Sequence, residues 1–149
     1  MKNICWYFDL PKIKLLLKRG FKLNDKNGGS SVLQMCLEGT GILVFRCDSA
    51  RATKAWEAAV ELAEMGARWV PDPRDMFLVR CGLRHTDIEK WVEVAAVLLK
   101  TGAADHATLG KLFGSPWMRA HLRYCRGEEA MAAILGAKWW QPKRGRRER

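Results

Sequence analysis

The sequence lacks any apolar run near the length of about 20 residues that a membrane-spanning helix needs. Its first residues, MKNICWYFDLPKIK, place aromatic and charged side chains where a secretory signal has an uninterrupted apolar segment. We therefore expect an intracellular, cytoplasmic protein that does not engage a membrane. A nuclear location stays open.

Cysteines are few, and their spacing is irregular. The five cysteines are Cys5, Cys36, Cys47, Cys81 and Cys125. Their number is odd, and two of them lie inside apolar helical patterns, which favours reduced thiols packed as small hydrophobes over a disulfide framework. No pair has the spacing of a metal site, so we predict no metal; a zinc site assembled from distant residues stays as the weaker alternative.

Motifs for catalysis are also missing. The chain has three histidines, His85, His106 and His121. None has an acid or a nucleophile at a spacing that defines a catalytic set. The acidic pairs Asp72/Asp75 and Glu128/Glu129 fit a turn and a helix opening, and the GTG and NGGSS segments lack the lysine of a phosphate-binding loop. We predict no enzyme, no cofactor and no small-molecule substrate.

The composition is that of a globular domain with basic ends. The 149 residues are 48% hydrophobic and 28% charged, which is enough to bury a core. The net charge of +10 divides into +5 from residues 1–26 and +5 from residues 138–149. Residues 27–137 carry thirteen charges of each sign. The basic character therefore belongs to the two ends.

One helical pattern recurs along the chain, most clearly in residues 86–102. Thr86 and Glu89 have the spacing of a capping box, and Gly102 ends the segment. The apolar residues between them fall on one stripe of a helix. They are Ile88, Trp91, Val92, Ala95, Leu98 and Leu99. The same ending recurs at Gly20, Gly66 and Gly136, so the pattern predicts four helices that each stop at a glycine.

Other helices are expected between these stops. Ser30 or Ser31 begins one, Pro71 and Pro73 precede another, and residues 105–114 and 115–125 form two more, the last with Ser115 as cap. Residues 39–48 are ambiguous between a buried strand and an apolar connector, and we favour the connector because no partner strand is evident. In the helix of residues 48–66, the glutamates form an outer stripe suited to face a basic segment. They are Glu57, Glu61 and Glu64.

Residues 15–36 resemble the junction between two ankyrin repeats. The matching positions are Leu15, Leu16, Leu17, Gly20, Asn24, Asp25, Gly28, Ser30, Val32 and Met35, whereas Ser31 and Leu33 replace the usual proline and histidine. The helix-ending glycines lie 46, 36 and 34 residues apart, and ankyrin units have about 33 residues.

The resemblance implies an all-α fold, a short ankyrin-like helical-repeat stack with a helical C-terminal cap and a basic tail. Residues 1–137 form one domain, which is ankyrin-like over about 11–107 and has its cap at 108–137; residues 138–149 form the tail. A different two-helix solenoid remains an alternative.

Such stacks present broad surfaces, so the resemblance implies a non-catalytic scaffold that binds another protein or protein assembly. The candidate partner-binding residues are Arg68, Trp69, Arg74 and Trp117. Exposed tryptophans dominate binding energy when they fill a pocket. Alternatively, Trp69 and Trp117 pack as wedges between adjacent repeats, and we slightly favour this interpretation.

The alternative function is binding of RNA or DNA through both basic ends. The candidate residues are Lys12, Lys14, Lys18, Arg19, Lys22, Lys143, Arg144, Arg146 and Arg147. Trp139 and Trp140 would stack on bases, and binding would weaken steeply with salt. Against this, the two tryptophans fit the last hydrophobic layer of the stack, and a charged terminus is commonly a solvated one.

Overall fold

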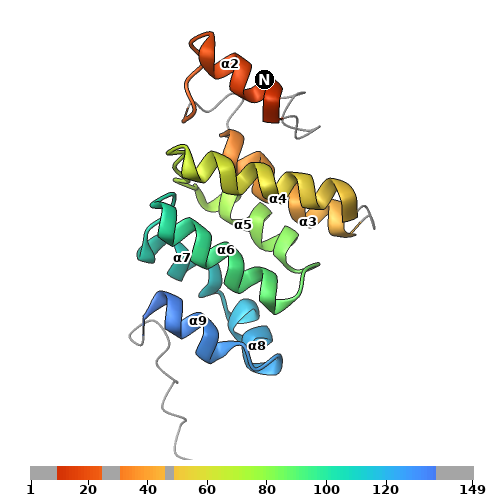
Figure 1. Ribbon diagram of the computed structural model, residues 1–149. Helices are drawn as coiled ribbons and strands as arrows, with labels where there is room; N and C mark the ends of the chain where they lie inside the picture. Colours follow the sequence, from red (N-terminus) through yellow and green to blue (C-terminus); the bar gives the residue numbers. More distant parts are fainter. Residues whose placement is uncertain (1–9, 25–30, 46–48, 137–149) are drawn as a thin grey trace, which may run out of the picture.

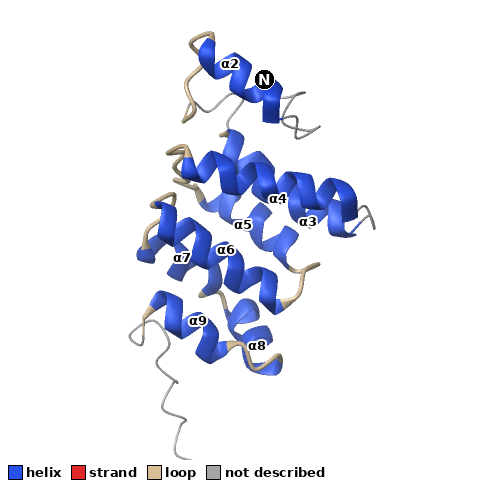
Figure 2. Cartoon of the chain, viewed as in Figure 1, coloured by secondary structure: helices blue, strands red, loops and turns tan. Residues whose placement is uncertain are grey.

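The computed structural model describes residues 10–24, 31–45 and 49–136, and within them the chain is helical and contains no strand (Figures 1 and 2). The helices are α2 (Leu10–Lys18), α3 (Val32–Phe45), α4 (Ser49–Glu64), α5 (Pro73–Leu83), α6 (Ile88–Thr101), α7 (His106–Phe113), α8 (Pro116–Tyr124) and α9 (Glu128–Leu135). The predicted all-α class is confirmed.

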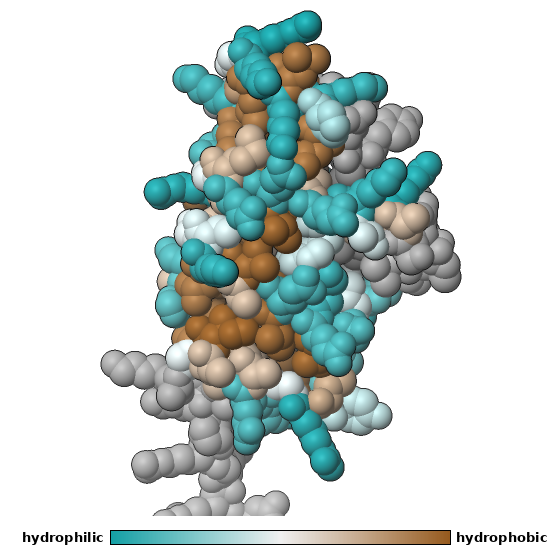
Figure 3. All heavy atoms as spheres, in the orientation of Figure 1, coloured by the Kyte–Doolittle hydropathy of each residue, from teal (hydrophilic) through white to brown (hydrophobic). Residues whose placement is uncertain are grey.

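The helices form a row, with α2 at one end and α8 and α9 at the other (Figure 1). Helix α3 packs against α4 and α5, α4 packs against α6, and α6 packs against α9. The helices that end at Gly66 and Gly102 therefore lie in contact. One hydrophobic core continues through the row from Ile13 to Leu135. On the face shown in Figure 3, hydrophobic residues appear along the length of the row, among projecting hydrophilic side chains.

The four predicted helix-ending glycines all have positive φ. The angles are 99° at Gly20, 97° at Gly66, 74° at Gly102 and 92° at Gly136. A residue with a Cβ adopts this conformation only at an energetic cost, so glycine is favoured at these positions by its backbone freedom. The predicted helix ends are confirmed.

The loops that follow these glycines are tied to one another. The backbone N–H of Arg68 donates to Asn24 Oδ1 at 2.8 Å, and the backbone N–H of Trp69 donates to the carbonyl oxygen of Ala103 at 2.7 Å. The loop after Gly66 thus joins the loops that follow Gly20 and Gly102. These bonds hold together the ends of the three helices that stop at Gly20, Gly66 and Gly102.

A buried glutamine links α3 to α5 and to the loop before it. Gln34 is 1% exposed, and its Nε2 donates to the carbonyl oxygen of Asp75 at 3.1 Å and also to Glu38. Its Oε1 accepts a hydrogen bond from the indole N–H of Trp69, which is 2% exposed. The side chain of Gln34 therefore satisfies polar groups that would otherwise be buried without partners.

Side chains of α4 contact α2 on one side and α6 on the other. Glu61 forms an ion pair with Lys14 of α2. The prediction that the glutamates of this helix face a basic segment is therefore confirmed for Glu61. Toward α6, the indole of Trp56 donates to Glu93, and Lys90 lies 4.2 Å from the centroid of the same ring.

Two local predictions are wrong. Helix α3 runs on to Phe45, so residues 39–45 are neither a connector nor a strand. Their apolar run does not distinguish a buried strand from a buried helix by periodicity. The cap of α6 is Asp87, whose side chain accepts from Lys90 N at 3.1 Å. Thr86 instead donates its hydroxyl to the Leu83 carbonyl at the end of α5, at 2.8 Å.

Candidate functional site

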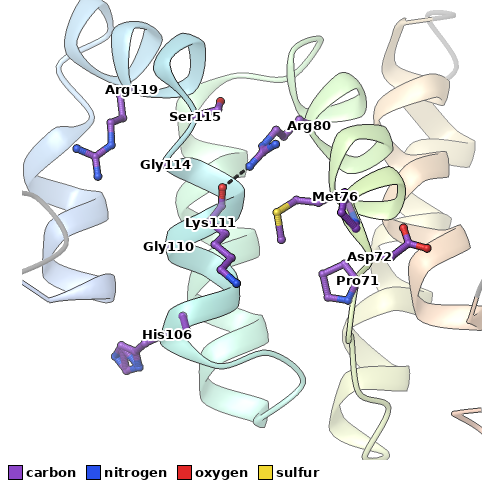
Figure 4. Close-up of a pocket in the computed structure, with 12 residues that line it drawn as sticks. Pro71, Asp72, Met76, Arg80, His106, Gly110, Lys111, Gly114, Ser115 and Arg119 are labelled. Carbon is purple, nitrogen blue, oxygen red and sulfur yellow. Dashed lines mark hydrogen bonds between the residues drawn. The ribbon is translucent and has the colours of Figure 1, made fainter.

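A groove of about 740 Å³ lies between α5 and α7 and extends to the start of α8. Ala107, Gly110 and Gly114 line it from the α7 side, and their spacing of three and four residues places them on one stripe. Met76 and Arg80 of α5 stand on one side of this stripe, and Arg119 of α8 stands on the other (Figure 4). The small residues of α7 therefore form the floor of the groove.

The α5 side of the groove is positioned by a capping box. Asp75 N donates to Asp72 Oδ1 at 2.7 Å, and Asp72 N donates to Asp75 Oδ2 at 3.3 Å. Pro73 occupies the first turn, where its missing N–H costs no helical hydrogen bond. The acidic pair noted in the sequence is thus used to begin a helix, which aims Met76 and Arg80 at α7.

Arg80 joins the two walls. Its Nε donates to the Leu112 carbonyl at 2.8 Å, and its Nη2 donates to the Lys111 carbonyl, as the dashed line in Figure 4 indicates. These are carbonyls at the end of α7, where a helix lacks its own donors and favours a cation. Burial lowers the pKa of Arg80, but an arginine keeps its charge at neutral pH. The guanidinium is therefore fixed at the edge of the groove.

Glycine is required at the upper end of the floor. A Cβ built on Gly114 would collide with the carbonyl oxygen of Gly110. Ser115 then caps α8 by accepting from Met118 N at 3.3 Å, with Pro116 in the first turn. The cap confirms the sequence prediction for this helix. The sharp turn at Gly114 brings Arg119 to the groove.

Positive side chains outnumber negative ones in the groove lining. Arg80, Lys111 and Arg119 carry permanent charges, and Asp72 is the one carboxylate among the lining residues. Close by, Asp105 caps α7, and the backbone hydrogen bond from Thr108 lowers its pKa. Both carboxylates accept hydrogen bonds from helix amides, so each is already used by its own helix.

The predicted partner-binding residues separate into exposed and buried ones. Arg68 and Arg74 are exposed, on the loop before α5 and in its first turn. Trp69 is buried at 2% exposure, so it is not an exposed anchor. Its indole N–H finds an acceptor in Gln34, and its ring fills the core between helix pairs. The prediction that Trp69 binds a partner is corrected in favour of the wedge.

Trp117 is 40% exposed and belongs to an aromatic cluster. Its ring stacks on that of His121 with centroids 5.2 Å apart and an interplanar angle of 8°, and the guanidinium carbon of Arg84 lies 4.4 Å from its centroid. Buried Trp91 of α6 lies 6.0 Å from Trp117 and 5.1 Å from His121. These contacts hold α8 against α6, so Trp117 has a packing role as well as an exposed edge.

The predicted nucleic-acid-binding residues are not brought together in the described part of the chain. Lys12, Lys14 and Lys18 lie on α2, and Arg19 and Lys22 follow it. Lys143, Arg144, Arg146 and Arg147 lie outside the described residues. The last described helix, α9, lies at the far end of the row from α2 (Figure 1).

In residues 10–24, 31–45 and 49–136, no group of three or more His, Cys, Asp or Glu side chains could hold a metal ion. None of the helices described here has both the length and the apolar surface to cross a membrane. The sequence analysis did not identify the groove or its cations, which are Arg80, Lys111 and Arg119. The available signal for the groove floor was the helical spacing of Ala107, Gly110 and Gly114.

Comparison with known proteins does not assign a family. No protein-family model matches the sequence, and no significant match was found among curated proteins or among solved structures. Any assignment of function therefore depends on the groove and the surfaces beside it.

Proposed function

We propose that this protein is a non-catalytic binding module that holds a segment of another protein in the groove between α5 and α7. The observation that carries the proposal is the groove itself, at about 740 Å³. Small-molecule pockets have volumes of roughly 300–1,000 Å³, so the groove has room for a few side chains of a bound segment. Its floor is built from small residues, which lets a bound chain approach the α7 backbone closely.

The arrangement of the helices supports this proposal. We interpret the row as degenerate ankyrin-like repeats, because its helix pairs end at positive-φ glycines and because their loops are joined by hydrogen bonds. Stacks of this kind bind partners through surfaces that span neighbouring units. The groove spans such units, since one wall comes from α5 and the floor comes from α7.

Two exposed apolar residues are sequence neighbours of residues that line the groove. Val70 is 72% exposed and directly precedes Pro71, and Phe77 is 58% exposed and directly follows Met76. Exposed Arg68 and Arg74 lie close to them in sequence. Arginine and aromatic residues supply much of the energy of protein interfaces, so these side chains extend the proposed contact beyond the groove.

The test is a selection of binders from a library of random 12-residue peptides displayed on phage. Ala107→Trp places a large ring over the groove floor, and Ala133→Trp makes the same change at an exposed position of α9. We expect selected peptides to bind the wild-type protein and the Ala133→Trp variant and to lose binding to Ala107→Trp. Selected peptides that bind all three proteins equally would contradict the groove as the binding site.

Nucleic-acid binding is the second candidate, favoured by the exposed cations Lys12, Lys18 and Arg19 at the α2 end of the row. It predicts that a 20-nucleotide single-stranded DNA or RNA binds at low salt and is released steeply as salt rises. Deletion of residues 141–149 should weaken that binding. Absence of binding at low salt would eliminate this candidate.

A further inference from the structure

We propose that His121 and Cys125, one turn apart at the end of α8, form a binding site for a divalent transition-metal ion of the zinc type. The ligands are the imidazole Nε2 of His121 and the deprotonated Sγ of Cys125. This site lies outside the residues that line the groove, so it is tested independently of the proposed function.

The two ligand atoms already have the separation that tetrahedral zinc requires. His121 Nε2 and Cys125 Sγ lie 3.6 Å apart. Zinc–nitrogen and zinc–sulfur bonds of about 2.0–2.1 Å and 2.3 Å at a tetrahedral angle place nitrogen and sulfur about 3.5–3.6 Å apart. Without a metal, a thiol–imidazole hydrogen bond spans the same distance. The metal ion replaces the proton between the two atoms, and that proton passes to the buffer as the metal–sulfur bond forms.

The backbone keeps both side chains on one face of the helix. The N–H of Cys125 donates to the His121 carbonyl at 2.9 Å, the helical hydrogen bond between residues four apart. The chain turns directly afterwards, because Arg126 has a φ of 55° and the N–H of Gly127 donates back to the Leu122 carbonyl at 2.9 Å. This closed helix end holds Cys125 one turn beyond His121.

The imidazole of His121 is positioned by two tryptophans. Its ring stacks on that of Trp117 with centroids 5.2 Å apart and an interplanar angle of 8°. The ring of Trp91, which is fully buried, lies 5.1 Å away. Nε2 of the ring so held is the atom that contacts the thiol of Cys125. A ligand that is oriented before binding loses less conformational freedom when the metal arrives.

The pair is open to solvent. Cys125 is exposed and His121 is partly exposed, so an ion reaches them without unfolding. Zinc sites usually have three or four protein ligands, and with two from this pair, water completes the coordination and the ion should exchange readily. Arg123 and Arg126 flank Cys125 in the chain, and the thiolate offsets part of the repulsion between these cations and a divalent ion.

The test measures metal binding by the full chain in the presence of a phosphine reductant, which keeps the thiols reduced. Co²⁺ bound to a thiolate gives a charge-transfer absorption band in the near ultraviolet, and Zn²⁺ is then titrated to displace it. The proteins are wild type, His121→Phe, Cys125→Ser and the control Cys81→Ser, which removes a free thiol from α5. Phenylalanine keeps a ring to stack on Trp117, and Cys125 is exposed, so melting curves of these variants should stay close to that of wild type.

We expect wild type and Cys81→Ser to show the band and to bind one Zn²⁺ per chain. Cys125→Ser and His121→Phe should each bind at least about tenfold more weakly, since loss of even an outer-shell partner of a metal ligand costs about 10- to 100-fold in affinity. One ion per two chains would also support the inference, because the same two residues of each chain then supply all four ligands.

Three results would overturn the inference. The first is the absence of a cobalt band in wild type. The second is binding by His121→Phe equal to that of wild type, which would leave the thiol without its imidazole partner in the site. The third is a loss in Cys81→Ser as large as that in Cys125→Ser, which would show that thiols elsewhere in the chain hold the metal.

Discussion

Replacement of Gln34 by leucine should destabilise the protein, because Gln34 is the acceptor for a buried indole. Gln34 and Trp69 are 1% and 2% exposed, so water does not replace the lost acceptor. A buried donor without a partner costs about 1–3 kcal/mol. The Asp75 carbonyl also loses its bond from Gln34 Nε2. We therefore expect Gln34→Leu to lower the free energy of unfolding by about 2–3 kcal/mol.

A double-mutant cycle tests this reasoning by urea unfolding followed by circular dichroism. Trp69→Phe alone removes the donor and leaves the Gln34 acceptor unpaired, whereas the double variant removes both partners. Its loss should therefore be smaller than the sum of the single losses by about 1 kcal/mol or more.

The control cycle pairs Gln34→Leu with Trp91→Phe. The indole of Trp91 donates to the Leu83 carbonyl at 2.8 Å and does not involve Gln34, so these losses should add. Additivity within about 0.5 kcal/mol for Gln34 and Trp69 as well would refute the idea that their hydrogen bond matters.

Two further changes test the fold. Burial raises the pKa of Glu38 above its ordinary 4.5, and Asp75 acts in the same direction. Protonation of Glu38 therefore stabilises the folded state. This contribution to the free energy of unfolding is complete below pH 4.5 and is lost as the pH rises through the raised pKa. Glu38→Gln should consequently gain stability relative to wild type between pH 4 and pH 7 in urea unfolding, and an unchanged difference would contradict this. Gly66→Ala should cost about 1–2 kcal/mol, although nothing lies within 4 Å of the added Cβ; a melting temperature equal to that of wild type would contradict a purely backbone cost.

The sequence was sufficient where one residue alone sets the structure. Positive φ is a property of the backbone at a single position, so the glycine-ended helices were predictable. The extension of α3 to Phe45 was not, because a short apolar run suits either a strand or a helix. The cap of α6 was not predictable either, because Thr86 and Asp87 are neighbours of similar capping ability and compete for one position; in the structure Asp87 takes it.

The candidate site was less predictable because it depends on residues far apart in the chain. Arg80 bonds to carbonyls 31 and 32 residues away, and Trp69 reaches Gln34 across 35 residues. The burial of Trp69 follows from that second contact, which no local pattern reveals. Arg68 and Arg74 are exposed, but the groove beside them exists only once α5, α7 and α8 have packed.

The joined loops have a consequence for how this protein opens. The segment after Gly66 holds its neighbours on both sides, through Asn24 and through Ala103. The helix that ends at Gly66 separates from its neighbours only when both hydrogen bonds break, whereas the helices that end at Gly20 and Gly102 each have to break one of them. Unfolding should therefore spread inward from the ends, and the backbone amide of Trp69 should exchange its hydrogen more slowly than amides in α2 or α9.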